Sequence, residues 1–403
     1  MPRRTRVLLV LGAAALALGT AAVAARTPAK ATAGSGATMP RTYVPADGSA
    51  TLAAVPPRDA REVRLRKVLH AEPERVDVAV QLARLDVQRN RTLSDPRYLG
   101  RAQATLARWW HLAAPPPDVL LLRAVIRQSL HDFTGARADL DRLVAADPGD
   151  TEAQLTRAVV STIVADYRAA RQSCDAIAGK VSPLVAATCT AAIDAITGRA
   201  GEAYARLAQV VAASDGEALQ LRTWALTTLA EIAIMRGDPA AAVQHLRAVV
   251  ELDPDDAYGR AALADVYLGT GRAAEASALL AGREQIDNLL VRRAIAEHVT
   301  SGPDRTRLVG AMRDRIAAAA ERGDRIHLRE EARFTLEVEN DPRRALAIAL
   351  EDFAVQKELA DARLVAAAAF AANDLAAAEP VRTWATLHRV DDAQLRHWLG
   401  DRP

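Results

Sequence analysis

Aromatic residues and cysteines are scarce in this sequence. Phe, Trp and Tyr make up 4% of its 403 residues, and two cysteines are present. Because half of the residues are nevertheless apolar, the hydrophobic content comes mainly from Ala, Leu and Val, of which Ala and Leu are strong helix formers. Two isolated cysteines also exclude a zinc site with CxxC spacing. The composition therefore predicts an all-α protein without a cysteine-bound metal.

The sequence also lacks an excess of charge of one sign. It holds 52 basic and 50 acidic residues. A surface that binds nucleic acid concentrates positive charge and often interleaves it with aromatic residues. No such stripe is found, so we expect no nucleic acid among the partners.

Catalytic motifs are absent as well. There is no GxSxG, Walker loop or HExxH, and no GxGxxG follows a predicted strand. The nearest cluster is His327 with Glu330 and Glu331, which share one helical face at this spacing. Such a group is more typical of a surface ion pair, and an unrecognised enzyme site there is the alternative. We therefore predict no enzyme activity and no cofactor.

The first 25 residues have the features of an export signal. Arginines at positions 3, 4 and 6 precede an apolar run from Val7 to Val23, and Ala22 and Ala24 have the spacing of a signal peptidase site. Cleavage after Ala24 would remove three arginines and change the formal net charge from +2 to −1. The alternative is an uncleaved inner-membrane anchor, although the Ala- and Gly-rich run is weakly lipophilic. We expect export, to the periplasm.

Residues 26–58 are rich in Ala, Thr, Pro and Gly and have little periodicity. Such a segment buries too little apolar surface to offset the entropy of ordering, so a flexible linker is expected. Beyond it, apolar residues recur at helical spacing and are interrupted about every dozen residues by Gly, Asp-Pro or Asn-Asp turns. This rhythm predicts helical hairpins.

A repeat of 34 residues is visible between residues 117 and 288: Thr151 follows Pro117, and Ala257 follows Thr223, by that interval. The eighth and twentieth positions of each unit hold alanine, and a small residue there lets two helices approach closely. Two units have a glycine between their helices and two end in proline, which stops a helix. The positions that recur in this way are Ala124, Ala136, Ala158, Ala170, Ala230, Ala242, Ala264, Ala276, Gly237, Gly271, Pro148 and Pro254.

These residues resemble the tetratricopeptide repeat family, and Asp253 to Leu280 is nearly typical of it. The resemblance implies a right-handed superhelical solenoid of antiparallel helix hairpins. It is good over residues 117–290, except that the unit from Ser182 to Asp215 is slightly out of register. Residues 59–116 are interpreted as an irregular first repeat with an insertion, and residues 291–403 as degenerate repeats with a C-terminal cap. The C-terminal third is similar to exported bacterial repeat proteins whose activity is not established.

The resemblance also implies a binding groove on the concave face, which the first helix of each unit lines. Its positions carry a protein or peptide partner in other members, although the basic clamp for a terminal carboxylate is not evident here. The alternatives are solvent exposure and, for the two aromatic residues, packing against a neighbouring repeat. The polar and aromatic candidates are Asp118, Gln128, Ser129, Glu152, Thr162, Trp224, Thr227, Glu231, Tyr258 and Asp265.

The cysteines, Cys174 and Cys189, flank a turn around Gly179 to Pro183. If each is a similar distance from the turn, antiparallel packing would bring them within reach of a disulfide, and an exported protein could keep that bond. The alternative is a pair of buried thiols that act as small apolar residues. The residues leave both possibilities open.

The sequence thus predicts an exported scaffold that binds a protein or peptide of the cell envelope. The main alternative is a membrane-anchored spacer or a self-associating assembly factor of the envelope. The groove varies freely among repeat scaffolds, so the identity of the partner does not follow from the repeat pattern.

Overall fold

The computed structural model describes residues 60–93, 97–321 and 328–400. These residues form helices and no strand, which confirms the predicted all-α fold. The predicted signal segment 1–25 and the predicted linker 26–58 both lie outside the described residues.

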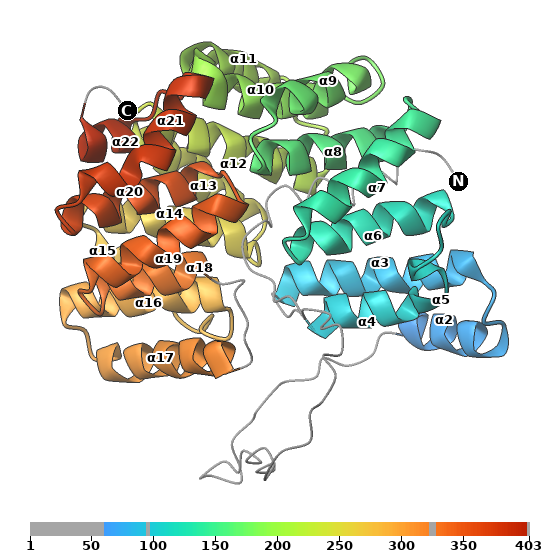
Figure 1. The fold of residues 1–403 in the computed structure, drawn as a ribbon, viewed down its shortest axis with the longest axis horizontal. Coiled ribbons are helices and arrows are strands. Elements are labelled where there is room, and N and C mark those ends of the chain that lie inside the picture. Colours follow the sequence, from blue (N-terminus) through green and yellow to red (C-terminus); the bar gives the residue numbers. More distant parts are fainter. Residues whose placement is uncertain (1–59, 94–96, 322–327, 401–403) are drawn as a thin grey trace, which may run out of the picture.

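The helices follow one another along the chain as antiparallel neighbours (Figure 1). Those of the N-terminal half are α2 (Ala60–Ala71), α3 (Val76–Leu93), α4 (Arg97–Thr105), α5 (Ala107–Trp110), α6 (Pro117–Ser129), α7 (Phe133–Ala146), α8 (Thr151–Ile163), α9 (Tyr167–Ile177), α10 (Pro183–Asp194), the π-helical turn η2 (Ala195–Arg199) and α11 (Ala200–Ala212). Those of the C-terminal half are α12 (Leu219–Met235), α13 (Pro239–Leu252), α14 (Ala257–Gly269), α15 (Ala273–Leu280), α16 (Asp287–Thr300), α17 (Arg305–Glu321), α18 (Leu328–Glu337), α19 (Pro342–Val355), α20 (Leu359–Ala371), the 3₁₀ turn η3 (Leu375–Ala378), α21 (Glu379–His388) and α22 (Ala393–Leu399).

The recurring alanines lie where the two helices of each hairpin meet. All eight are at most 3% exposed, so the small side chains allow close approach. The predicted unit starts Pro117, Thr151 and Ala257 are the first residues of α6, α8 and α14. The remaining unit differs, because α12 begins at Leu219, four residues before Thr223. The 34-residue period therefore corresponds to one helix hairpin.

The turn between the helices of a hairpin uses the left-handed backbone region. The fifteenth residue of each unit has positive φ, at Gly237 (75°), Gly271 (74°), His131 (59°) and Ala165 (60°). Glycine adopts this conformation without steric penalty, whereas His131 and Ala165 are held in it by the surrounding hairpin. The turn geometry thus repeats even where the glycine does not.

The unit that was out of register contains a break in its helix. Thr197 (φ −106°) and Gly198 (φ 88°) have non-helical backbone between α10 and α11. A Cβ atom on Gly198 would lie 2.8 Å from the carbonyl oxygen of Arg389, which follows α21. Glycine is therefore required both by the backbone angle and by the close approach of the C-terminal segment.

The stack curls so that its last helices return to its middle. Figure 1 shows the C-terminal α20, α21 and α22 beside α10 and α12, and α22 contacts α12 while α21 contacts η2. The backbone N–H of Lys357 donates to the carbonyl oxygen of Ile163 at 2.7 Å. One hydrophobic cluster accordingly includes Leu155 of α8 and Leu395 of α22. The core is continuous between segments that are far apart in the sequence.

Candidate functional site: the inner face and the Asp194 cluster

Two predicted groove residues are joined by an arginine that was not predicted. Arg84 of α3 lies 3.0 Å from Glu152 of α8 and 3.6 Å from Asp118 of α6. Burial raises the pKa of Glu152, and the charge and hydrogen bond of Arg84 only partly offset this effect. Arg84 therefore ties the first helices of three successive units together.

Two further candidates form a hydrogen-bonded pair. The hydroxyl group of Tyr258, at the start of α14, donates to the carboxylate of Glu231 in α12. Burial raises the pKa of both groups. Both residues are half-buried, and the electrostatic influence of Arg363 reaches Glu231 from α20. The pair faces the C-terminal helices of the same chain.

Asp265 of α14 is held by arginines from the next two units. Arg292 of α16 donates to both its oxygens at 2.9 and 2.7 Å, and Arg333 of α18 donates to one of them. Burial alone would raise the Asp265 pKa, but the charges of the two arginines outweigh it and lower the pKa. Asp265 therefore links consecutive units.

The other candidates make local contacts. Gln128 is 2% exposed, and Ser129 beside it is half-buried. The hydroxyl groups of Thr162 and Thr227 donate to carbonyl oxygens one turn earlier in their own helices, at 2.9 and 2.8 Å. Trp224 is half-buried against the main hydrophobic cluster. Contact of a partner with any of the ten candidates stays a prediction.

A buried charged group at the C-terminal hairpins did not emerge from the sequence. Arg329 of α18 donates to Asp361 of α20 at 2.8 Å and also to Glu358. Asp352, at 3% exposure, shares a side-chain hydrogen bond with Asp361, and burial followed by the Asp361 charge raises the pKa of Asp352 to about 9. The carboxyl group of Asp352 therefore holds a proton at neutral pH. This group joins α18, α19 and α20, and its charges also act on Tyr258.

The predicted cluster at the start of α18 is divided by the structure. His327 lies outside the described residues. Glu331 accepts a hydrogen bond from Arg344 of α19 at 3.0 Å, whereas Glu330 is buried at 4% exposure. The two glutamates therefore have different surroundings, and Glu331 takes part in an ion pair between helices.

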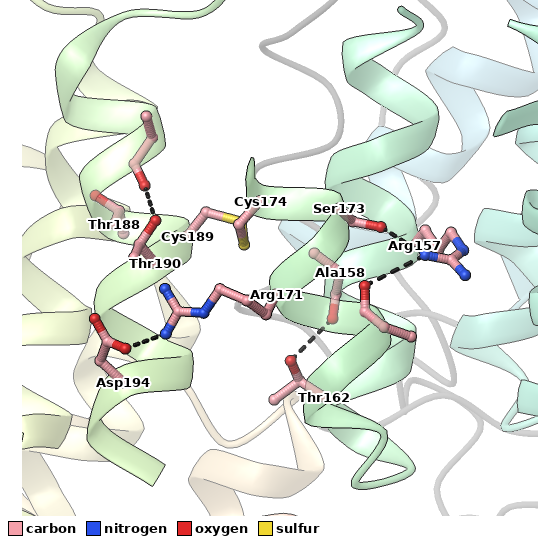
Figure 2. The surroundings of a disulfide bond; sticks show 12 residues. Arg157, Ala158, Thr162, Arg171, Ser173, Cys174, Thr188, Cys189, Thr190 and Asp194 are labelled. Carbon is pink, nitrogen blue, oxygen red and sulfur yellow. Dashed lines mark hydrogen bonds and ion pairs between the residues drawn. A yellow bond between two sulfur atoms is a disulfide. The ribbon is translucent and has the colours of Figure 1, made fainter. Parts of the chain in front are cut away.

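The two cysteines are joined in a disulfide that connects α9 to α10, with their Cα atoms 5.7 Å apart (Figure 2). Cys174 and Cys189 are 1% and 6% exposed. On the other side of α9, Arg157 of α8 donates to the hydroxyl oxygen of Ser173 at 2.9 Å. Covalent and polar contacts thus fasten three successive helices together.

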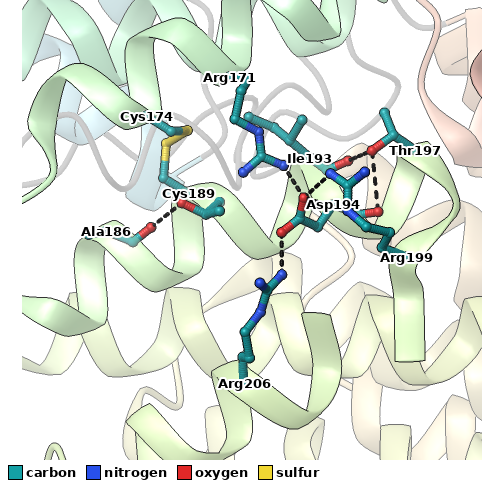
Figure 3. Close-up of polar contacts among 10 residues, drawn as sticks. Arg171, Cys174, Ala186, Cys189, Ile193, Asp194, Thr197, Arg199 and Arg206 are labelled. Atoms are coloured by element: carbon teal, nitrogen blue, oxygen red, sulfur yellow. Dashed lines mark hydrogen bonds and ion pairs between the residues drawn. A yellow bond between two sulfur atoms is a disulfide. The ribbon is translucent and has the colours of Figure 1, made fainter. Parts of the chain in front are cut away.

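Beyond the disulfide, three arginines converge on one carboxylate (Figure 3). Arg171 of α9, Arg199 of η2 and Arg206 of α11 all donate to Asp194, the last residue of α10. Burial alone would raise the Asp194 pKa, but the hydrogen bonds and charges of Arg199 and Arg171 outweigh it and lower the pKa. We call these four residues the Asp194 cluster.

The Asp194 cluster could not be predicted from the sequence because its members share no short motif. The one available signal was the irregular unit from Ser182 to Asp215, whose break brings Arg199 close to Asp194.

In residues 60–93, 97–321 and 328–400, no group of three His, Cys, Asp or Glu side chains is placed to hold a metal ion. Over the same ranges, no helix combines the length and the apolar character needed to cross a membrane.

Comparison with known proteins agrees with the helical repeat. The family model described as tetratricopeptide repeat matches residues 233–296, which run from α12 to α16. A search of curated proteins finds no match.

Several solved structures match this chain at low sequence identity. A tetratricopeptide repeat protein from Parabacteroides merdae is 18% identical, with 58% of this chain and 90% of that chain covered and a TM-score of 0.43. The TPR domain of P58(IPK) is 15% identical, with 84% and 90% covered and a TM-score of 0.23. The APC/C heterotetramer of Cut9 and Hcn1 contains a chain that is 14% identical, with 84% and 85% covered and a TM-score of 0.29. The protein is thus an all-α helical-repeat protein whose residues 233–296 match the tetratricopeptide repeat family.

Proposed function

We propose that this protein is a non-catalytic, exported scaffold that binds a protein or peptide of the cell envelope. The observation that carries the proposal is the stack of helix hairpins, with a family match at residues 233–296. Stacked hairpins offer an extended, ordered surface to a partner without a catalytic centre. The scaffold function is the one that this architecture supports best.

The packing of the inner face bears on where a partner binds. Glu231, Tyr258 and Asp265 have side-chain partners within their own chain, and α22 packs against both α12 and α20. A partner that entered the inner face would have to compete with these contacts. We therefore favour the outward-facing surface for partner binding.

Export is supported by two independent features of the sequence and the fold. Residues 1–25 have the pattern of a signal segment, and the Cys174–Cys189 disulfide belongs in an oxidising compartment. We propose a periplasmic location, with retention in the inner membrane through an uncleaved segment 1–25 as the second possibility.

Photocrosslinking in the native envelope tests the scaffold function. A photoreactive residue replaces Gln209 on the exposed side of α11 or Tyr258 on the inner face, and adducts are identified by mass spectrometry. One dominant protein adduct from position 209 is the expected result. An adduct from position 258 alone would instead indicate that the partner binds in the inner groove. The absence of adducts at both positions, from a folded and exported chain, would contradict partner binding. In that case, recovery of the chain in the membrane fraction with an intact N-terminus would favour a membrane-anchored spacer. Adducts that form only between copies of this chain would instead favour a self-associating assembly factor.

A further inference from the structure

The Asp194 cluster contains more positive charge than its carboxylate neutralises. Arg171, Arg199 and Arg206 each pair with Asp194, so three positive charges face one negative charge. Among the described residues, no second carboxylate lies within 4.0 Å of any of these guanidinium groups. Two positive charges are therefore left without a close counter-charge.

Other arginine clusters of this protein are closer to balance. Arg292 and Arg333 share Asp265, but Arg333 also pairs with Glu337. The charge excess at Asp194 is therefore not a general consequence of the high arginine content.

The two kinds of charge in the cluster differ in their access to solvent. The side chain of Asp194 is 4% exposed, whereas those of Arg171, Arg199 and Arg206 are 26%, 48% and 57% exposed. A molecule that approaches from solvent consequently meets the guanidinium groups and not the carboxylate. Two exposed acidic residues lie about one helical turn away: Asp175 is four positions after Arg171, and Glu202 is three positions after Arg199 and four before Arg206. Among the described residues, neither lies within 4.0 Å of a cluster guanidinium group.

The arginines have hydrogen-bonding capacity to spare. A guanidinium group carries five N–H donors in a planar fork. Arg171 and Arg206 each use one nitrogen on Asp194, and Arg199 uses two. The remaining donors match the bidentate geometry of an incoming carboxylate.

The cluster is also held in place before any partner arrives. Its residues come from α9, α10, η2 and α11, and the Cys174–Cys189 disulfide joins the first two of these helices (Figure 3). Gly198 packs against the backbone of Arg389 on the other side of η2. Since Asp194 already restricts the arginine side chains, a ligand loses less rotamer freedom on binding there.

We propose that Arg171, Arg199 and Arg206 form a docking site for an acidic segment of a partner protein, one rich in Asp and Glu side chains. Asp194 positions the arginines, and two or more carboxylates of the segment neutralise the excess charge. The inference rests on the proposed scaffold function and names the surface and the partner chemistry for it. The site lies where two hairpins join, and none of its residues is among the ten groove positions that the family resemblance implied.

Fluorescence anisotropy with a labelled octaglutamate peptide tests this site on the oxidised full chain. We expect the double variant Arg199→Gln/Arg206→Gln to bind the peptide about tenfold more weakly than the original protein, and higher salt to weaken the original binding. Arg343→Gln, at an exposed position of α19, removes one charge elsewhere and is the matched control for Arg206→Gln alone. It is expected to change affinity by less than about twofold. An octaglutamine peptide should not bind.

Several results would overturn the proposal. The double variant could bind octaglutamate as well as the original protein, or Arg343→Gln could weaken binding equally. Arginine-dependent binding of phosphatidylglycerol vesicles without binding of octaglutamate would replace the protein partner by a lipid surface. Circular dichroism checks the fold, and Arg206→Gln alone, at the most exposed cluster arginine, serves if the double variant is unfolded.

Crosslinking from position 209 separates this site from the scaffold function itself. If the original protein and the double variant yield the same partner adduct equally well, the scaffold function holds and the docking site is wrong. If octaglutamate binding depends on the arginines but no partner adduct forms, the acidic-segment site holds and the scaffold function fails.

Discussion

The indole N–H of Trp384 donates a hydrogen bond to the hydroxyl oxygen of Tyr167 at 3.2 Å, although 217 residues separate them in the sequence. Tyr167 also contacts the ring of His388 edge to face, with centroids 4.7 Å apart. Both partners of the hydrogen bond are buried. This pair fastens the C-terminal helices to the middle of the stack.

Tyr167→Phe is therefore expected to destabilise the fold. It removes the acceptor and leaves the indole N–H of Trp384 buried without its partner, which lowers the free energy of unfolding by about 1–3 kcal/mol. Urea denaturation followed by circular dichroism measures this change. Leu387→Ala on α21, the helix of Trp384, is the control, because Leu387 is 73% exposed and its loss should change stability by less than about 0.5 kcal/mol. Equal effects of the two substitutions would contradict the role of the pair.

Removal of the disulfide is expected to lower stability without changing the fold. The bond closes a short loop, since its cysteines are 15 positions apart, and the loss of such a cross-link from the unfolded chain corresponds to about 3 kcal/mol. Cys174→Ala with Cys189→Ala should therefore unfold at a lower urea concentration than the oxidised protein. Mass spectrometry after alkylation without reductant checks the bond. Full labelling of both thiols in the protein recovered from cells would show that the disulfide does not form.

Gly198→Ala should be poorly tolerated. Its φ of 88° disfavours any side chain, and the added Cβ would lie 2.8 Å from the carbonyl oxygen of Arg389. We expect a loss of about 1–3 kcal/mol in the free energy of unfolding. Gly201→Ala, three residues later in α11, meets no atom within 4 Å and should be neutral or stabilising. A loss at position 201 as large as that at position 198 would argue against this account.

The buried Asp352 should make the protein less stable at alkaline pH. Its folded-state pKa is raised from 3.8 to about 9 by burial and by the charge of Asp361, with Arg329 acting in the opposite direction. The stabilising contribution of the neutral carboxyl is therefore complete below the unfolded pKa and is lost as the pH rises through the folded pKa. We expect a lower melting temperature near pH 9 than near pH 6.

Asp352→Asn should reduce this pH dependence, because the amide resembles the neutral acid in shape and carries no proton to lose. Asp175→Asn at an exposed position of α9 is the control and should leave the dependence as it was. If the melting temperatures of Asp352→Asn and the original protein fall in parallel, Asp352 is not the titrating group.

Local rules of helix packing account for the part of the fold that was predicted from the sequence. The alanines at the eighth and twentieth positions are buried as expected, and the helix boundaries at Pro117, Thr151 and Ala257 follow from capping and turn residues. The resemblance to tetratricopeptide repeats agrees with the family match, which covers residues 233–296. These features depend on interactions within one or two hairpins. Such local interactions can be predicted from the repeat pattern of the sequence.

The curvature of the stack could not be predicted in the same way. Contacts such as that between Lys357 and Ile163 depend on small rotations that accumulate from one hairpin to the next. These rotations cannot be predicted from the repeat pattern. For this reason, Tyr258 and Asp265 were placed on an open groove by analogy, whereas they have partners within the chain. The Asp194 cluster escaped prediction because three different elements supply its arginines.

The backbone hydrogen bond from Lys357 to Ile163 has a consequence for how the protein unfolds. In an open array each repeat contacts only its two neighbours, and the ends unfold independently of the centre. Here the return of the last hairpins to α8 and α12 gives the central repeats a third neighbour. Detachment of α20–α22 would expose the apolar residues in the middle of the stack to solvent. The C-terminal end and the centre are therefore expected to unfold as one cooperative unit.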